Sequence, residues 1–566
     1  MRDLLDPWTD LLHRQVLTFP PLACGYVFRS IRGRFTSRPS SSLMASDAPA
    51  AHAPYLTVNP WLIAAAVMLA TFMEVLDTSI ASVALPYIGG SLAATTEEAT
   101  WVLTSYLVAN AVILPASGWF SLRFGRKRFL IVCIAIFTFS SFLVGSSTSL
   151  AMILIARALQ GAGGGALQPV SQAILLESFS PEKRGMAMAA FGFGVVVAPV
   201  LGPTLGGWIT ETYTWRWAFF INIPIGILAI ILISQFVTDP PYIRNAHPGR
   251  LDAIGLGLLA TWVGALQIVL DKGQEDDWFG ATWIRWAVAV IIISLVAFLW
   301  RELRGRKPLV NMRVFEDRNF SIGCLQIFLF GAIVYGMVTL LPLFFQTLMG
   351  YTSLAAGVAV APRGLGAVIA MPLVGLLMSK IDSRTLIMIG FGGVAASNWW
   401  LSNIDLQIGP WTLFLAITMS GFFLGFVFVP LATVAMGTLP DEQIGNASGL
   451  YNLFRNIGGS IGISLVETIV TRHEQVHRNY LVHSVNPANP VFRNVVHGLE
   501  GVLNHHYSAP DAMMRALKLI ELTTDQQAAL LSYVDDFHYL AITAILTVPV
   551  GFALKKIAAG RRVSAH

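Results

Sequence analysis

Apolar runs of about 20 residues, separated by short polar connectors, follow one another from residue 61 to residue 557. A bilayer core about 30 Å thick requires about 20 mostly apolar residues per helix. Lipid offers no hydrogen-bond partner to an open backbone, so helices are the expected form of these runs. The pattern predicts fourteen spans, namely 61–83, 100–120, 129–147, 150–175, 187–209, 218–236, 253–270, 283–300, 320–346, 355–379, 385–403, 411–436, 446–470 and 538–557.

Composition agrees with a membrane protein and excludes a chain of soluble domains. Of 566 residues, 55% are hydrophobic and only 12% are charged, whereas soluble domains average about 25% charged residues. The three cysteines, Cys24, Cys133 and Cys324, are far apart and odd in number, so they predict no disulfide framework. The fold class expected is an all-α integral membrane protein.

The net charge of +5 is a topology signal. With the N-terminus in the cytoplasm, Lys and Arg gather in the inner loops, as the positive-inside rule requires. The short outer loops hold only Arg216, Lys272 and Arg285, and the long connector 471–537 lies outside the rule. Both termini are therefore expected in the cytoplasm. The inner-loop residues are Arg123, Arg126, Lys127, Arg128, Lys183, Arg184, Arg244, Arg250, Arg301, Arg304, Arg306, Lys307, Arg313, Arg318, Lys380 and Arg384.

No basic face is interleaved with stacking aromatics, which argues against nucleic-acid binding.

The first 60 residues form an arginine-rich cytoplasmic leader, and its apolar stretch, Leu17 to Phe28, is too short to span. Met44 opens a polar segment directly before the first span. We expect translation to begin near Met44, so that residues 1–43 are either disordered or not made. Residues 558–566 form a cytoplasmic tail.

Ionisable residues inside spans are costly and are functional candidates by default. Glu74 and Asp77 lie three residues apart in the first span, on one helix face. Two like charges this close in a low dielectric favour protonation of one of them, so the pair predicts a proton-coupling site. Arg157 in the fourth span lies at the depth of Asp77 and is its expected partner. The alternative is a carboxylate neutralised by an arginine for structure alone.

Two further arginines lie within spans. Arg363 in the tenth span follows Pro362, and it is expected either to bond to the backbone carbonyls that the proline frees or to meet substrate. Arg455 lies in the thirteenth span and needs a carboxylate or carbonyls nearby. Phe72, Gln326, Tyr335 and Phe345 are expected to line a substrate cavity with apolar and aromatic walls.

Glycine-rich stretches predict close helix packing. The run Gln160 to Gly165 lacks the Lys and Ser/Thr of a phosphate loop and interrupts an apolar helix, so small-residue packing is expected. Gly194 to Gly207 adds Pro199 and Pro203, which predicts a kinked helix. The loop Gly118 to Arg128 predicts a tight turn whose Arg123 reaches a neighbouring helix end or carboxylate. His473 and His477 have helical spacing, but no further ligand is evident, and no metal site is expected.

These motifs together resemble the major facilitator superfamily, specifically its 14-spanner drug:proton antiporters of the EmrB/QacA type. The loop with Gly118, Arg123 and Gly125 is similar to the superfamily's signature between spans two and three, although Leu122 replaces its usual aspartate. The resemblance covers about residues 55–557. Its other carriers in the superfamily and its antiporters are Leu76-Asp77-Thr78-Ser79 in span one, Arg157-Ala-Leu-Gln160-Gly161 in span four, Gly202-Pro203-Thr-Leu-Gly206-Gly207 in span five and Trp215-Arg216-Trp217 to Gly226. A further set is similar to the EmrB branch, namely Leu266 to Gly273 with Asp277-Trp278-Phe279, Arg318-Asn319-Phe320, Arg455 with Gly459 to Gly462, and Ser484 to Pro487.

The resemblance implies a six-helix bundle at 61–236, two extra spans at 253–300 and a second six-helix bundle at 320–557, which carries a long periplasmic loop at 471–537. It implies proton-driven export of hydrophobic, drug-like compounds across a bacterial inner membrane. It also implies partners, a periplasmic adaptor of the EmrA type and an outer-membrane channel of the TolC type, and no cofactor. Asp77, Glu74 and Arg157 would couple the proton, and Gly202, Pro203, Gly206 and Gly207 would belong to the moving elements.

Three alternatives stay open. In the first, a proton-coupled exporter on the same fold carries one metabolite, such as a fatty acid or a siderophore. An intramembrane transferase would need paired catalytic groups at one membrane face, which the inner loops lack. A non-transporting receptor would tolerate loss of Asp77.

Overall fold

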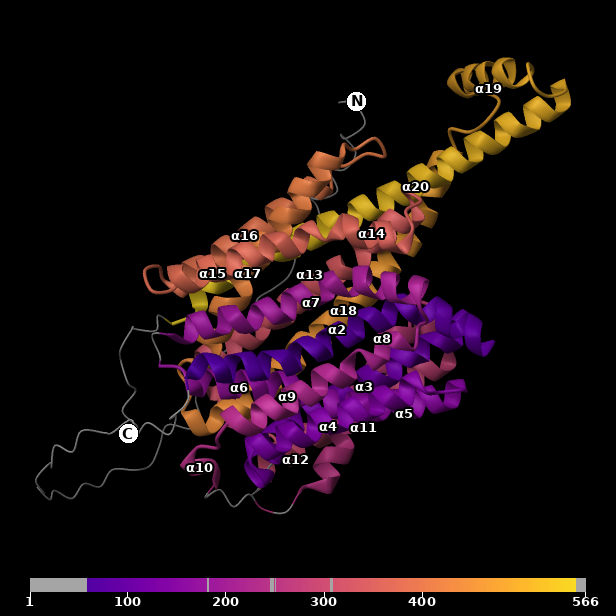
Figure 1. Cartoon of the computed structure of the whole chain (residues 1–566). Helices are drawn as coiled ribbons and strands as arrows, with labels where there is room; N and C mark the ends of the chain where they lie inside the picture. Colours follow the sequence, from indigo (N-terminus) through magenta and orange to yellow (C-terminus); the bar gives the residue numbers. More distant parts are fainter. Residues whose placement is uncertain (1–58, 181–182, 245–248, 250, 306–308, 556–566) are drawn as a thin grey trace, which may run out of the picture. The chain divides into compact units, whose positions relative to one another are not determined.

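The computed structural model describes residues 59–180, 183–244, 249, 251–305 and 309–555. The start near Met44 and the roles of leader and tail fall outside these residues. Within them the chain is helical throughout and contains no strand. Figure 1 shows the long helices lying side by side.

Thirteen helices in the described part of the chain are long and apolar enough to cross a membrane. The helices of the first half are α2 (Pro60–Leu92), α3 (Thr96–Phe124), α4 (Arg126–Gly145), α5 (Leu150–Gly164), α6 (Leu167–Ser178), α7 (Arg184–Thr212), α8 (Trp217–Phe220), α9 (Asn222–Phe236), α10 (Pro241–Arg244), α11 (Ala253–Lys272), η2 (Trp278–Gly280) and α12 (Thr282–Arg304). Those of the second half are η3 (Met312–Glu316), α13 (Arg318–Thr347), α14 (Ser353–Val360), α15 (Pro362–Leu377), α16 (Ser383–Leu401), α17 (Pro410–Met436), α18 (Asp441–Val482), α19 (Pro490–Leu503), α20 (Ala509–Thr547) and η4 (Val548–Ala553).

The element missing from the predicted fourteen spans is α16. It forms a helix where predicted and packs against α17 and α20. It is not among the thirteen, and its sequence includes the polar residues Arg384 and Asn398. Three predicted spans are each divided into two α-helices, α5 with α6, α8 with α9 and α14 with α15. Pro362 begins α15, because proline lacks the N–H that a continuous helix would need.

The connector predicted at 471–537 is mainly helical. Helix α18 continues to Val482, and α20 already begins at Ala509, so both extend past the apolar stretches at 446–470 and 538–557. Figure 1 shows that α18 and α20 run together beyond the other helices and that α19 lies at the tip. We call residues 471–537, which comprise the outer part of α18, all of α19 and the first part of α20, the extension. The apolar pattern did not predict these helical segments, because a search for apolar runs of about 20 residues detects only segments that can span a bilayer.

Two helices, α2 and α18, each pack against several other helices. Helix α2 packs against α3, α6, α7 and α9, and α18 packs against α13 and α20. Helix α7 also contacts α14, α15 and α17, so it lies between the two halves of the chain. The glycines of α5 make the predicted close packing: a side chain at Gly161 or Gly165 would overlap the carbonyl oxygens of Tyr106 or Asn110 on α3.

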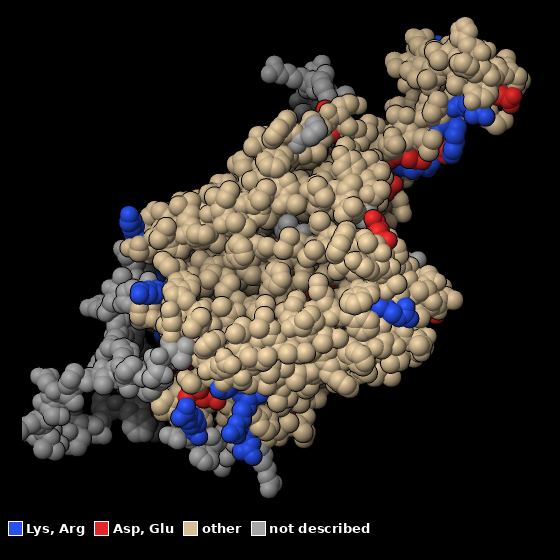
Figure 2. Space-filling view, viewed as in Figure 1, with Lys and Arg blue, Asp and Glu red and all other residues tan. Residues whose placement is uncertain are grey.

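Helices α11 and α12 are joined at one end by a bidentate ion pair. Asp252 caps α11 and accepts hydrogen bonds from Arg301 Nε at 2.7 Å and Nη2 at 2.8 Å. These bonds lower the pKa of the Asp252 carboxyl. Figure 2 shows that the flank of the visible face carries few charges, whereas Lys and Arg gather at the end near α10 and charges of both signs lie along the extension.

Candidate functional site

Asp77 lies at the centre of a buried polar cluster. Its Oδ2 accepts a hydrogen bond from Arg157 Nη1 at 2.6 Å, and neither side chain is exposed. Its Oδ1 accepts from Gln160 Nε2 at 3.0 Å and from Asn222 Nδ2 at 2.6 Å. The contact between Asp77 and Arg157 that the sequence predicts is therefore present, and three donors stabilise the charged carboxylate.

The arginine of this cluster is fixed by groups from three helices. Arg157 Nε donates to the carbonyl of Val102 at 3.0 Å, and its guanidinium lies 4.3 Å from the ring centre of Tyr106. Gln160 Oε1 accepts from Nη1 at 2.7 Å. Separating this guanidinium from its carboxylate would leave each charge buried without its counter-ion, which costs free energy. The two side chains therefore form a rigid unit.

Glu74, one helical turn earlier on α2, has a different set of partners. Its Oε1 accepts from Asn110 Nδ2 at 3.2 Å and from Tyr106 Oη at 3.5 Å, and its Oε2 accepts from Gln168 Nε2 at 2.7 Å. The side chain is buried, so it does not approach lipid. All of its direct partners are neutral, in contrast to those of Asp77.

Gln168 on α6 connects Glu74 to the other half of the chain. Its Oε1 accepts a hydrogen bond from Nη2 of Arg455 on α18. A turn further along α6, Gln172 Oε1 accepts from Ser448 Oγ and Asn452 Nδ2, both at 2.8 Å. A buried carboxylate in one half and a buried guanidinium in the other are thus joined through one amide. Sequence reasoning missed Gln168, because an isolated glutamine in an apolar helix gives no signal of its partners.

The Gly202 motif places α7 directly against α2 beside this cluster. A side chain at Gly202 would overlap Ser79, two residues from Asp77. Ser79 Oγ donates to the carbonyl of Pro199 at 3.1 Å. That carbonyl has no helical partner because residue 203 is proline, so Ser79 supplies the missing donor. Gly206 approaches Ile80 in the same way, and Pro203 packs against α14 at Gly357, whereas Gly207 faces Leu354.

This packing predicts a stability effect. We expect Gly202→Val to lower the melting temperature of the purified protein, since overpacking a helix contact costs about 1–3 kcal/mol. Gly90→Val is the matched control, because Gly90 lies on α2 with open space around it. Equal melting temperatures for the two variants would contradict the close contact.

At the basic end of the helices, Gly125 forms the predicted turn with a φ of +84°, a conformation that favours glycine. The contact expected of Arg123 is made instead by Arg126. Helix α3 continues past Arg123, which is exposed, whereas Arg126 begins α4 and forms a 2.5 Å ion pair with Glu177. Tyr242 Oη donates to Glu177 at 2.8 Å, and burial raises the pKa of this phenol.

The same end joins the two halves of the chain. Arg184 at the start of α7 forms a 3.3 Å ion pair with Asp441 at the start of α18. Gly118 on α3 leaves space for the backbone of Asn446. The side-chain amide of Asn446 exchanges two 3.0 Å hydrogen bonds with the backbone of Asn311.

Arg363 is buried, and its Nη1 and Nη2 find no hydrogen-bond acceptor among the described residues. The predicted bonds from these atoms to carbonyls freed by Pro362 are therefore not formed. A buried cation without a partner is costly, so this position is suited to a group that the chain itself does not supply.

The four expected lining residues are not brought together. Phe72 is partly buried beside Gly194 of α7, whereas Gln326 is fully buried near Gly551 of η4. Tyr335 packs on Gly459 of α18. Phe345 stacks on Tyr351 at a centroid distance of 5.4 Å, in a separate apolar cluster.

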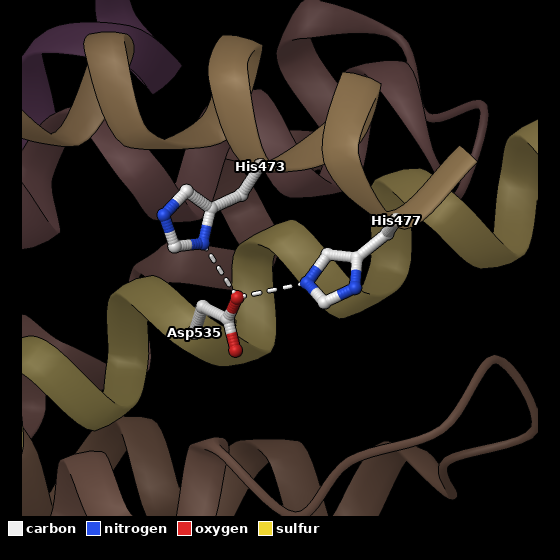
Figure 3. Close-up of side chains that lie close together, drawn as sticks. All are labelled: His473, His477 and Asp535. Carbon is white, nitrogen blue, oxygen red and sulfur yellow. Dashed lines mark hydrogen bonds and ion pairs between the residues drawn. The ribbon is translucent and has the colours of Figure 1, made fainter. Parts of the chain in front are cut away.

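Among the histidines, His473 and His477 meet a carboxylate that the sequence did not reveal. Figure 3 shows both rings directed at Asp535 of α20. This cluster lies on the extension and is separate from the buried α2 site.

Comparisons with known proteins give one consistent result. A family model described as "Major Facilitator Superfamily" matches residues 67–463. "Multidrug export protein EmrB" of Haemophilus influenzae is 40% identical over 440 residues, which cover 77% of this chain and 85% of that protein. "Fatty acid resistance protein FarB" of Neisseria gonorrhoeae is 36% identical over 493 residues, covering 86% and 94%. Among solved structures, the proton:xylose symporter XylE shares the fold, with a TM-score of 0.54 at 15% identity, over 85% of this chain and 94% of that chain.

Proposed function

The chain belongs to the major facilitator superfamily, and we propose that it is a proton-coupled multidrug exporter of hydrophobic, drug-like compounds. The superfamily makes it a multi-span transporter and not an enzyme. The substrate class is supported by the similarity to the multidrug export protein EmrB. The proton coupling is supported by two buried carboxylates on α2, each with its own partner set.

The observation that carries the coupling is the chain of contacts from Glu74 through Gln168 to Arg455. The direct partners of Asp77 come from helices of the first half, so movement between the halves leaves them in place. The Gln168 contact to Arg455 crosses from α6 to α18 and would break when the halves separate. Glu74 is then left buried with neutral partners, and a buried carboxylate without a cation gives up its charge most readily.

This difference assigns the two carboxylates different parts in alternating access. Asp77 holds a fixed negative charge against Arg157. Glu74 takes up a proton when Arg455 withdraws and releases it when Arg455 returns. Protonation of Glu74 favours one facing state and substrate binding favours the other, so that drug and proton cross the membrane in opposite directions.

The domain boundaries follow the same proposal. We assign one six-helix bundle to residues 61–236, the extra pair of spans to 253–300 and the second bundle to 320–557. Support comes from α7, which packs against α2 of the first group and against α14 and α15 of the second.

Orientation and partners are proposed from charge and family. The basic end near α10 is assigned to the cytoplasm of a bacterium, and the extension, at the other end of the helices, to the periplasm (Figure 1). In that orientation both termini are cytoplasmic, and the extension is placed to dock an adaptor of the EmrA type, which would lead to an outer-membrane channel of the TolC type.

The proposal is tested with everted membrane vesicles, whose interior corresponds to the periplasm. An imposed gradient of two pH units, acid inside, supplies about 2.7 kcal/mol per proton, enough for about a hundredfold accumulation of substrate. We expect a lipophilic dye to accumulate in vesicles that contain the protein and to leave when an ionophore collapses the gradient. Accumulation that ignores the gradient would contradict antiport.

A second candidate function, export of fatty acids, is favoured by Arg363. Its buried guanidinium lacks an acceptor for two nitrogens among the described residues, and a fatty acid carboxylate supplies the bidentate acceptor that a guanidinium prefers. The similarity to the fatty acid resistance protein FarB supports the same substrate.

Arg363 predicts a change in substrate preference. We expect Arg363→Gln to reduce transport of a long-chain fatty acid at least tenfold, since one charge-assisted hydrogen bond contributes about 1.5–3 kcal/mol. Transport of a lipophilic cationic dye should stay near wild type and serves as the internal control for folding. Arg363→Lys keeps the charge and should recover part of the fatty acid transport. An equal loss for both substrates would mean that Arg363 does not recognise the anion.

A further inference from the structure

Three potential metal ligands converge where α18 and α20 enter the extension. His473 Nδ1 and His477 Nε2 lie 2.7 and 2.8 Å from the same Oδ2 atom of Asp535 (Figure 3). The three ligand atoms all lie within 4.8 Å of one another. The two histidines are one helical turn apart on α18, so the helix itself fixes their spacing.

We propose that His473, His477 and Asp535 bind a divalent transition-metal ion, with Zn²⁺ as the ion that fits best. Two imidazoles and one carboxylate are a ligand set typical of zinc sites that keep a further position for water. The side chains are 32%, 25% and 30% exposed, so water can complete the coordination. This site is independent of the proposed transport function.

The geometry needs only a small adjustment to hold the ion. Zinc lies about 2.0–2.2 Å from nitrogen and oxygen ligands, which places tetrahedral ligand atoms about 3.3 Å apart. The two distances from the histidine nitrogens to Asp535 Oδ2 are shorter than this by about half an ångström, and all three side chains are partly exposed. Each ring can move its proton to its other nitrogen, so both stay neutral ligands.

A bound ion would join α18 to α20 at the base of the extension. A 2.7 Å bond from Arg478 Nε to Asp525 already connects the same two helices further out. One turn before His473, Thr468 accepts from the indole of Trp278 at 3.1 Å. The ion would therefore stiffen the point at which α18 leaves its contacts with the other helices.

The test uses the purified full-length protein on an affinity tag without histidine, stripped of metal and titrated with Zn²⁺ by calorimetry. Co²⁺ is the spectroscopic probe, because its visible absorption reports a tetrahedral N/O site. We expect one ion per chain and a higher melting temperature with Zn²⁺. His473→Gln/His477→Gln should bind at least about a hundredfold more weakly, since even outer-sphere partners of zinc ligands cost 10–100-fold.

The matched control is His505→Gln/His506→Gln, which removes two exposed histidines from the same extension and should bind like wild type. Asp535→Asn is a second site variant, and it should also lose the ion. Because asparagine has nearly the shape of aspartate, this variant keeps the test valid if the double variant fails to fold. The proposal is overturned if wild type binds no Zn²⁺ at micromolar concentration. It is equally overturned if the site variants and the control bind alike, because the ion then sits on surface histidines.

Discussion

Replacing Asp77 with Asn is expected to abolish gradient-driven accumulation of substrate in everted vesicles and to destabilise the folded protein. Arg157 and Asp77 are both fully buried and lie 2.6 Å apart. Removing one partner of such a pair leaves an uncompensated buried charge, which costs about 3–5 kcal/mol. The melting temperature of the detergent-solubilised variant measures the stability, and dye accumulation measures the transport.

A double variant separates these two effects. Asp77→Asn/Arg157→Gln contains no uncompensated charge, so its melting temperature should return most of the way to wild type. Its transport should stay below about a tenth of wild type, because the fixed charge that favours proton uptake at Glu74 is gone. A double variant that accumulates dye at the wild-type level would show that the pair is purely structural.

Replacing Glu74 with Gln is expected to uncouple transport from the proton while leaving the protein folded. The glutamine amide has the size of the carboxylate and keeps its oxygen for Asn110 and Tyr106. Exchange of labelled for unlabelled substrate needs no net proton movement, so it should persist. Accumulation driven by a pH gradient should fall to background.

The control for this variant is Glu98→Gln. Glu98 is an exposed carboxylate that caps the start of α3, so its removal takes away a charge without touching the buried cluster. We expect Glu98→Gln to accumulate dye like wild type. Loss of both exchange and accumulation in Glu74→Gln would point to misfolding or to a substrate-binding role, and the melting temperature distinguishes these two.

The sequence predicted the fold well, because helix length, hydrophobicity and loop charge follow directly from the bilayer. Asp77 and Arg157 could be paired in advance, since both lie at matching depth and each needs a partner. Gln160 and Asn222, which complete this cluster, stood in the motifs that indicate the family. Their contact with Asp77 depends on how α5 packs on α3 and α4 and on how α9 packs on α2.

Other features could not be predicted from the sequence. Gln168 acquires its importance from Arg455, 287 residues away, and Asp535 meets His473 only because α20 packs back on α18. A contact that depends on tertiary packing leaves no periodic signal in the chain. Arg123 lies in the last turn of α3, whereas Arg126 begins α4 after the Gly125 turn, and it is Arg126 that forms the ion pair with Glu177.

The most direct test of the account measures protons. Purified protein is reconstituted into liposomes that contain a pH-sensitive dye, and substrate is added without any imposed gradient. Wild type should move protons against the substrate, and Glu74→Gln should bind and exchange the same substrate with no proton signal. If Glu74→Gln moves as many protons per substrate as wild type, Glu74 does not carry the proton and the proposed coupling through Gln168 and Arg455 is wrong.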